Sequence, residues 1–461
     1  MNRILFIIAA AVCLFTGSCK KFIDVNEDPN RPTAVGEAAI LAPAELAISH
    51  GLHGGNAAII VQEYLQVIAL NQPVPNAGTY FMQHTNIDVD WTTLYATCLN
   101  NLVRLDSVAS VNGNSNYRAI ARVLQAYCLG FGTDLWGDIP YTQALQGEQN
   151  FTPAYDEQAA IYDRIQALLD GAIADIAQNS AVVPGGDDYF YGGDMSKWEK
   201  LAYTLKARYY MHLTKAPGHS AATQAGLALA ALEKGMASGD DDLKFDYDGI
   251  AGQENVWYST FLSASTLILA SGFVDTLKAH NDPRLSKMVK PAAETGLYTG
   301  RQIGDIDVGS LEAYSRPTDF YQGAAGNNYI VIYLEALFLK AEATLIQSGA
   351  AAAEPIYQEA IRTHMEQLGV SGSDITTYLT ARGTLTAANA LQRIMEEKKV
   401  ANFLSVESFT DWRRTGYPVM IKVPNALSEI PRRLLYPQAE IVANPQPEQD
   451  AVLTDRVWWD Q

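Results

Sequence analysis

Cysteine is scarce in this sequence. There are four in 461 residues, and two of them, Cys13 and Cys19, stand near the start. No CxxC pair and no regular cysteine spacing is present, which excludes a thioredoxin-like redox site and a small disulfide-stapled fold. Cys98 and Cys128 fall on segments with helical spacing. We expect two buried free thiols there, with a disulfide between them as the alternative.

Enzyme signatures are also absent. The sequence has no GxSxG, HExxH, P-loop or GxGxxG motif, so no common hydrolase, metalloprotease or nucleotide-binding site is indicated. Pairs of glycosidase carboxylates have no sequence signature, and an α-helical glycoside hydrolase therefore stays open as an alternative. We expect a protein that is not an enzyme.

Basic residues are few. Lys and Arg number 33 against 51 Asp and Glu, for a net charge of −18. A body this acidic is a poor candidate for binding nucleic acid or anionic lipid. Beyond the first residues, no apolar run approaches the ~20 residues that a membrane-spanning helix needs. Any membrane attachment must therefore come from acylation or from a partner protein.

The first residues carry an export pattern. Arg3 precedes an apolar run of 12 residues, 4–15, and Thr16-Gly17-Ser18-Cys19 follows. The run has the length of a signal-peptide core, and small residues before a cysteine resemble a bacterial lipobox, in which the cysteine is acylated. Ordinary signal cleavage with an unmodified Cys19 is the alternative. The expected organisation is a signal peptide over 1–18, a lipidated tether over 19–33 and one folded domain over 34–461.

Apolar residues recur mostly with helical spacing, and alternating strand patterns are rare. The fold is therefore expected to be mostly α. The clearest helical segments are 117–131, 161–173, 201–213, 330–345, 356–368 and 391–403.

A weak internal repeat accompanies the helices. Small, aromatic and small residues stand at the spacing of a tetratricopeptide second helix, where small residues let two helices approach and the aromatic fills the groove between them. We expect degenerate tetratricopeptide-like helix pairs. The positions are Ala353, Tyr357 and Ala360, with looser copies at Ala228, Leu232 and Gly235 and at Gln158, Tyr162 and Ile165.

Long irregular stretches interrupt the helices at 71–90, 187–194, 240–258 and 295–328. Loops of this length in a compact domain are usually functional. The stretch 240–248 is rich in aspartate, but Lys244 occupies a ligand position and breaks the EF-hand calcium pattern. We expect a solvated acidic loop there. His50 and His53 share a helix face by spacing, but no further ligand follows them. No metal site and no cofactor are expected.

Seven separated segments resemble the SusD/RagB family of nutrient-binding outer-membrane lipoproteins, and most closely its SusD-like branch. The resemblance implies tetratricopeptide-like helix pairs carrying a loop-rich region. It further implies capture of oligosaccharides or peptides at the bacterial surface, and a SusC-like TonB-dependent transporter as partner. The segments are 22–30, 134–141, 191–201, 281–284, 333–343, 411–418 and 457–460.

Most of these segments have a structural explanation. Gly137 and Pro140 end a helix, and Asp411 with its neighbouring arginines is expected to pair charges beside a packed Trp412. The ligand site must be sought in the loops, where aromatic faces and polar groups suit sugars. Trp91 is expected in the core, and Trp257 and Tyr258 stay open between core and site. The candidate ligand-binding residues are Tyr80, Phe81, Trp257, Tyr258, Tyr314, Tyr321, Arg301 and Arg316.

The expected function is therefore that of a lipoprotein anchored in the outer membrane and facing the cell exterior. It would capture a nutrient, in first place an oligosaccharide, and deliver it to the transporter. Binding of a peptide or another small nutrient by the same mechanism is the alternative, as is a scaffold that binds only proteins.

Overall fold

The computed structural model describes residues 35–262 and 265–461, and Glu37–Gln461 form one compact unit. The expected signal peptide, the lipid-bearing Cys19 and the tether lie outside the described residues. Within that part of the chain, no helix combines the length and hydrophobicity needed to cross a membrane. Helices account for most of the fold, which confirms the predicted mostly α class.

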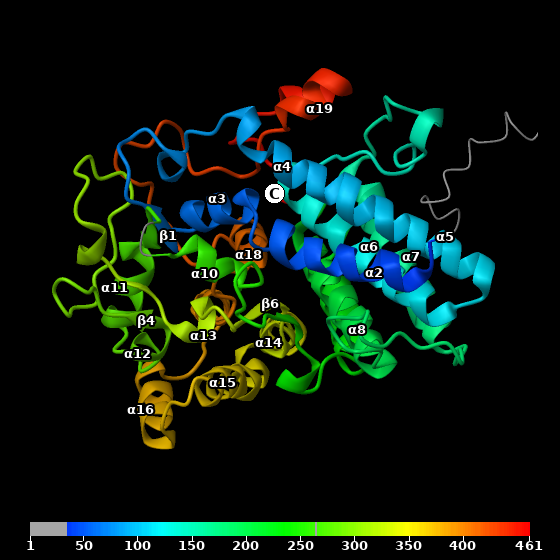
Figure 1. The fold of residues 1–461 in the computed structure, drawn as a ribbon. Coiled ribbons are helices and arrows are strands. Elements are labelled where there is room, and N and C mark those ends of the chain that lie inside the picture. The colour runs from blue at the N-terminus through cyan, green and yellow to red at the C-terminus, as the bar shows by residue number, and fades with distance from the viewer. Residues whose placement is uncertain (1–34, 263–264) are drawn as a thin grey trace, which may run out of the picture. The chain divides into compact units, whose positions relative to one another are not determined.

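Three helix pairs make up one half of the fold (Figure 1). They are α6 (Ser115–Trp136) with α7 (Gln158–Ile176), α8 (Met195–His212) with α9 (Ala221–Leu232), and α14 (Tyr333–Ser348) with α15 (Ala350–Gln367). The pairs stack through α7 against α8 and α9 against α14. This arrangement confirms the predicted helix pairs.

Small residues allow these helices to approach closely. Ala353, Tyr357 and Ala360 are all buried where α15 packs on α14, as the repeat spacing predicted. Gly130 of α6 faces Tyr209 of α8, and a Cβ atom at Gly130 would lie 2.1 Å from the tyrosine hydroxyl. A larger residue at 130 would therefore push the first two helix pairs apart.

The remaining helices surround these pairs and carry the loop-rich half of the fold. Two π-helical turns, η2 (Ala47–Leu52) and η5 (Thr93–Leu99), continue α2 and α4. The other helices are α2 (Glu37–Leu46), α3 (Asn56–Tyr64), α4 (Asp88–Thr92), α5 (Asn100–Asn112), α10 (Val256–Thr260), α11 (Ser271–Ala279), α12 (Leu285–Met288), α13 (Asp319–Gln322), α16 (Gly372–Arg382), α17 (Ala390–Ala401), α18 (Glu407–Thr415) and α19 (Gln438–Ala443).

Three short antiparallel strand pairs tie distant loops together. β1 (Ile68–Leu70) pairs with β3 (Leu267–Leu269), and β4 (Val289–Lys290) pairs with β5 (Arg316–Pro317). β2 (Leu243–Asp246) pairs with β6 (Asn327–Val331), with Leu243 opposite Val331 and Asp246 opposite Asn327. The predicted helix over 330–345 is thus wrong at its start, because Ile330 and Val331 belong to β6 and α14 begins at Tyr333.

The family-like segments meet in buried ion pairs. Arg208 Nε contacts Glu335 Oε1 at 2.6 Å, and Arg414 Nη2 donates to Glu342 Oε2 at 2.6 Å, so α14 is tied to α8 and α18. Arg413 stacks on Trp459, with its guanidinium carbon 4.7 Å from the ring centroid. Asp411 also pairs with Lys398 at 2.8 Å beside the buried Trp412. The structural interpretation of these segments is confirmed.

The acidic loop is only partly solvated, contrary to the prediction. Asp241 is buried, and its carboxylate pairs with Lys200 Nζ at 2.9 Å. Asp242 is also buried and accepts the backbone N–H of Tyr333 at 2.7 Å, at the start of α14. These two carboxylates hold β2 against the helix pairs, whereas Asp240 and Asp246 are exposed.

Cys98 and Cys128 are both buried free thiols, as predicted. Burial, together with a hydrogen bond between the two side chains, raises the pKa of the Cys128 thiol well above its ordinary value.

Candidate functional site

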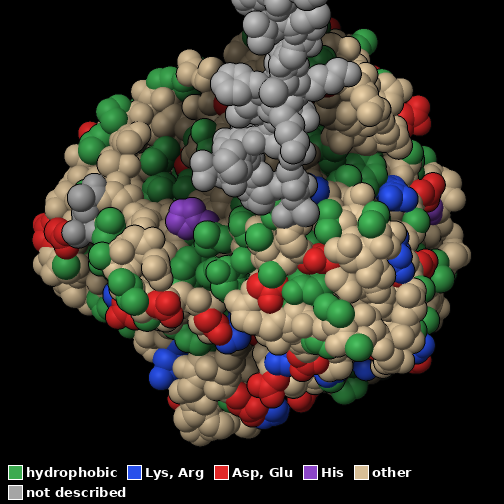
Figure 2. Space-filling model, turned by 45° about the vertical axis from the view of Figure 1, so that its right-hand side comes forward, with side chains coloured by type: hydrophobic (Ala, Val, Ile, Leu, Met, Phe, Trp, Pro, Cys, Tyr) green, Lys and Arg blue, Asp and Glu red, His purple; other side chains and the backbone are tan. Residues whose placement is uncertain are grey.

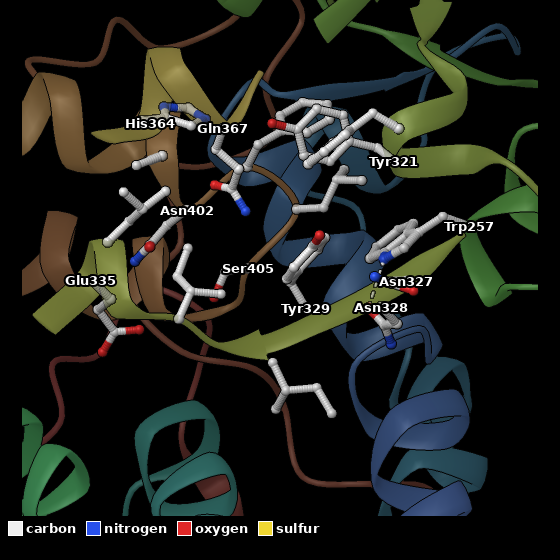
Figure 3. Close-up of a pocket in the computed structure, with 17 residues that line it drawn as sticks. Trp257, Tyr321, Asn327, Asn328, Tyr329, Glu335, His364, Gln367, Asn402 and Ser405 are labelled. Atoms are coloured by element: carbon white, nitrogen blue, oxygen red, sulfur yellow. Dashed lines mark hydrogen bonds between the residues drawn. The ribbon is translucent and has the colours of Figure 1, made fainter. Parts of the chain in front are cut away.

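Two predicted site aromatics, Trp257 and Tyr321, lie in the core. Both side chains are buried and line the same internal pocket (Figure 3). The indole N–H of Trp257 donates to Asn328 Oδ1 at 3.2 Å, and Tyr321 packs edge to face on Phe403 with centroids 4.8 Å apart. The cavity measures about 30 Å³, which suits one or two water molecules and no sugar ring.

Arg301 clamps its own loop. Its guanidinium donates to the carbonyl oxygens of Leu70, Asp307 and Asp305 at 3.1, 2.7 and 3.0 Å, and its side chain is buried. Tyr314 lies beside it, with the tyrosine hydroxyl 3.3 Å from Nη1. These two predicted residues come together, and the arginine donors are taken by backbone.

Arg316 plays a similar part for the loop that follows α10. Its Nη1 donates to the carbonyl oxygens of Phe261 and Leu262 at 2.9 and 2.8 Å. Tyr258, on α10, is exposed. Trp257 lines the internal pocket, and neither Arg316 nor Tyr258 is among the residues that line it.

Tyr80 and Phe81 lie in the early loop but differ in exposure. Tyr80 is buried with φ +65° and meets the Tyr64 ring edge on at 5.8 Å, whereas Phe81 is exposed. Trp91 is buried beside Trp136, with centroids 5.3 Å apart, as expected for core. The structure therefore distributes the eight predicted residues over several places.

A larger groove lies elsewhere, at the C-terminal end of α2. Its volume is about 880 Å³, within the range of roughly 300–1,000 Å³ typical of ligand sites. Figure 2 shows hydrophobic side chains gathered around a hollow on one face, with a histidine among them. Four segments form the walls: the end of α2 with η2, the turn η5, the loop 187–194, and β2 with the loop that follows it.

An aromatic cluster forms one wall of this groove. Tyr189 is 49% exposed, and its ring meets Phe245 edge to face with centroids 5.6 Å apart. Phe245 in turn packs on Tyr247 at 4.8 Å. Because the buried Phe245 ring packs against Tyr189 and is itself packed on Tyr247, Tyr189 offers an exposed aromatic surface with support behind it, which suits the apolar side of a sugar ring.

Tyr189 is positioned by an acidic anchor. Its backbone N–H donates to Glu45 Oε2 of α2 at 2.6 Å. The neighbouring Asp188 accepts the backbone N–H groups of Tyr191 and Gly193 at 3.0 and 2.8 Å, and the Trp198 indole N–H at 2.8 Å. Burial, with Asp188 close by, raises the pKa of Glu45 well above its ordinary value. These contacts fix the loop 187–194 against two helices.

The groove lining continues from this cluster along β2 and the loop that follows it. Tyr247 OH and Ser49 Oγ lie 3.0 Å apart, which joins this segment to η2. Gly249 has φ +69° and lies against Ala325, so that an added Cβ would come within 2.8 Å of the Ala325 nitrogen. The Asn255 N–H donates to Ala324 O at 2.9 Å. The loop 246–255 is thereby held along the groove.

Polar groups complete the lining. Asp246, Asp248 and Glu254 supply carboxylates, and Gln253 supplies an amide. Further polar lining comes from Thr93, Thr97 and His50. Carboxylates, amides and hydroxyls are the groups that hydrogen-bond sugar hydroxyls. His50 is exposed here while His53 is buried, so the two histidines do not form a pair.

Sequence reasoning missed this groove, although two of its walls lie in the irregular stretches 187–194 and 240–258 that it singled out. The available signal was Tyr189 within a short polar loop. Phe245 and Tyr247 alternate with aspartates in the manner of a half-buried strand. No local pattern indicates that these two stretches pack against each other.

One buried cluster has the composition of a metal site. Asp134, His212 and Glu407 offer ligand atoms within 4.8 Å of one another. His212 Nε2 lies 2.8 Å from Glu407 Oε1, whereas its Nδ1 lies 2.8 Å from the hydroxyl of Tyr162. Since one ring nitrogen does not face both carboxylates, hydrogen bonding explains the cluster better than a metal ion. Burial lowers the pKa of His212 to about 4.

The family model described as "Starch-binding associating with outer membrane" (SusD-like) matches residues 29–437. No curated protein matches the chain. A solved chitin-binding protein is 26% identical, with a TM-score of 0.79 over 92% of this chain and 100% of its own.

Two further solved structures have the same fold. A SusD/RagB family protein from Bacteroides thetaiotaomicron is 24% identical, with a TM-score of 0.80 over 93% of this chain and 99% of its own. A chitin-binding SusD homolog from Flavobacterium johnsoniae is 21% identical, with a TM-score of 0.79 over 92% and 98%. Since the family model covers most of the sequence and these structures share its fold, the chain belongs to the SusD-like family of starch-binding proteins that associate with the outer membrane.

Proposed function

We propose that this protein captures an oligosaccharide in the groove beside Tyr189 and delivers it to a SusC-like TonB-dependent transporter. The observation that carries the proposal is the combination in one groove of about 880 Å³ of a braced, half-exposed aromatic ring with carboxylate, amide and hydroxyl groups. Flat apolar faces and many hydroxyls are the two features that distinguish a sugar chain from most other nutrients.

The relatives suggest where to begin. Two of the similar solved structures are named as chitin-binding proteins. Oligomers of N-acetylglucosamine are therefore the first ligands to test, followed by starch fragments, because the family description names starch. A peptide panel tests the alternative nutrient class with the same assay.

Replacing Tyr189 by alanine is expected to weaken glycan binding about tenfold, which corresponds to ~1.4 kcal/mol, because the stacking surface is removed. Calorimetric titration of the purified protein with the best glycan measures this directly. The matched control is Phe151→Ala, which removes an aromatic that is 73% exposed and lies outside the groove lining. Equal affinity of Tyr189→Ala and the unmodified protein would remove the groove from the proposal.

The same titrations address the enzyme alternative. Glycan mixed with the protein is expected to be recovered at its original length, since a capture protein holds its ligand without cleaving it. Chromatography of the glycan after long incubation checks this. Release of shorter sugars, abolished by replacing a groove carboxylate with its amide, would favour a glycoside hydrolase instead.

The transporter half of the proposal is supported by exposed apolar side chains on neighbouring loops. Val419 and Ile421 are 69% and 80% exposed, and Leu427 and Phe81 are exposed nearby. The Leu427 N–H donates to Thr79 O at 3.0 Å, which joins the two loops. Large exposed apolar side chains clustered in this way commonly mark a partner surface.

Two variants are expected to separate membrane anchoring from binding to the transporter. Cys19→Ser is expected to lose incorporated fatty acid and to leave the membrane fraction, because lipid on Cys19 is the proposed anchor. Val419→Ser with Ile421→Ser is expected to keep the lipid and lose co-purification with the barrel, because only the apolar surface changes. Each variant serves as the control for the other, and retention of both properties in both variants would contradict this part of the proposal.

A further inference from the structure

The groove lining carries a net negative charge. Its lining includes the three carboxylates Asp246, Asp248 and Glu254, and no lysine or arginine is among the residues that line it. A net charge of −18 on the whole chain says little about one site, because a local basic pocket could reverse it. In this groove the local charge has the same sign as the whole chain.

The three carboxylates are not equally compensated. Asp246 Oδ1 lies 3.0 Å from Lys244 Nζ, which partly neutralises it. Glu254 Oε2 accepts the N–H of Gly252 at 2.8 Å. Within 35–262 and 265–461, no basic side chain lies within ion-pair distance of Asp248 or Glu254. These two residues therefore set the potential inside the groove.

The Asp248 and Glu254 carboxylates line the same groove as the aromatic ring on which a glycan would stack. Asp248 and Glu254 stand on the loop 246–255, which is held along one wall, while Tyr189 stands on another wall of the same groove. A carboxylate in a partly enclosed groove attracts a cation more strongly than the same group in open water, since less solvent screens it. An anionic sugar on Tyr189 would meet uncompensated negative charge.

We propose that this groove selects its ligand by charge and binds oligosaccharides that carry protonated amino groups, with Asp248 and Glu254 as the specificity-determining residues. The inference rests on the proposed function, because it names the ligand class of the same site. Glucosamine oligomers, the deacetylated form of N-acetylglucosamine oligomers, provide such amino groups. Uronic acid and sulfated oligomers are excluded by the same two carboxylates.

Three hexasaccharides of equal length test the proposal by calorimetry: fully N-acetylated glucosamine, fully deacetylated glucosamine at mildly acidic pH, and a galacturonate oligomer. A chelator is present throughout, so that metal bridging does not contribute. The deacetylated hexamer is expected to bind about tenfold more tightly than the acetylated one at low salt, and the difference should shrink in ~1 M salt. The galacturonate oligomer is expected to bind weakest.

Variants assign the selectivity to the groove. In Asp248→Asn with Glu254→Gln, the affinity ratio of deacetylated to acetylated hexamer is expected to fall to about one, because the uncompensated charge is gone. The control pair Asp163→Asn with Glu233→Gln removes the same charge from exposed positions on α7 and after α9, and should keep the ratio.

The outcomes separate the two proposals. A ratio near one in the unmodified protein, or a ratio that the groove variants leave unchanged, overturns charge selection while glycan capture stands. Binding of the galacturonate oligomer as tightly as the acetylated one overturns it as well. Failure of all three hexamers and of the starch fragments to bind, or binding that Tyr189→Ala does not weaken, overturns the proposed function itself.

Discussion

Replacing Arg284 by methionine is expected to lower the free energy of unfolding by about 3–5 kcal/mol, the usual cost of leaving a buried charge without its partner. Arg284 Nη2 lies 2.6 Å from both Asp282 Oδ2 and Glu397 Oε2, and its side chain is fully buried. Its Nη1 also lies 3.2 Å from His364 Nδ1. Methionine fills a similar volume but leaves the buried Asp282 without its cation, while Glu397 keeps only Arg382, whose Nε lies 3.1 Å from Oε1.

The effect should be large because the three charged side chains are all buried. Arg284 joins the loop before α12 to Glu397 of α17 and, through Tyr378, to α16, with the tyrosine hydroxyl 3.2 Å from Nη2. The Arg284 guanidinium holds the pKa of Asp282 below its ordinary value, against the opposing effect of burial. Without that cation, only hydrogen bonds from Tyr378 and from the backbone N–H at position 284 oppose the effect of burial on the carboxyl.

Urea unfolding followed by circular dichroism measures the loss. The matched control is Lys290→Met, which breaks an exposed ion pair with Asp319 at 2.6 Å and should cost no more than about 1 kcal/mol. A second variant that combines Arg284→Met with Asp282→Asn and Glu397→Gln should recover much of the stability, because the two carboxylates that Arg284 compensated are then neutral. Equal losses in Arg284→Met and Lys290→Met would show that the cluster contributes no more than a surface pair.

Replacing Glu63 by glutamine is expected to remove a pH dependence of stability that spans the neutral range. Glu63 lies on α3 and is buried, and its Oε2 has no hydrogen-bond partner among the described residues. Burial raises the pKa of Glu63 from 4.5 to about 8, opposed only by a hydrogen bond from the backbone of Gly78. At neutral pH this side chain is therefore mostly protonated in the folded protein.

The direction follows from comparing the two states. Between the pKa near 4.5 in the unfolded chain and about 8 in the folded one, the unfolded chain releases a proton that the folded protein keeps. The stability associated with Glu63 is therefore fully present below pH 4.5 and is lost as the pH rises through 8. The full loss is roughly 4 to 5 kcal/mol above that range.

Urea midpoints of the unmodified protein and of Glu63→Gln, measured from about pH 5 to about pH 9, test this prediction. Other titrating groups contribute equally to both curves and cancel in the difference. The unmodified protein should lose stability across the range relative to Glu63→Gln, and Glu233→Gln, an exposed change after α9, should follow the unmodified protein. A constant difference between Glu63→Gln and the unmodified protein at every pH would mean that Glu63 does not titrate in this range. Because Gly78 precedes Tyr80 in the early loop, the same titration should loosen that loop first.

The sequence by itself determined the helix pairs and the family. Helical spacing is a local property, so 117–131 and 161–173 are legible without knowing their neighbours. The family-like segments are legible for the same reason, and the structure explains them by ion pairs such as Arg208 with Glu335, which lie 127 positions apart. Local patterns failed at 330–331, because a short apolar run suits either a helix or a strand until pairing with β2 decides it.

Only the tertiary structure decided which aromatics face solvent. Trp257 is buried, with its indole N–H bonded to Asn328, 71 positions away, whereas Tyr189 stays half exposed although Phe245 packs against it. The groove exists only where α2, η5, the loop 187–194 and β2 meet. Burial depends on contacts between residues far apart in the chain, and no local spacing contains that information.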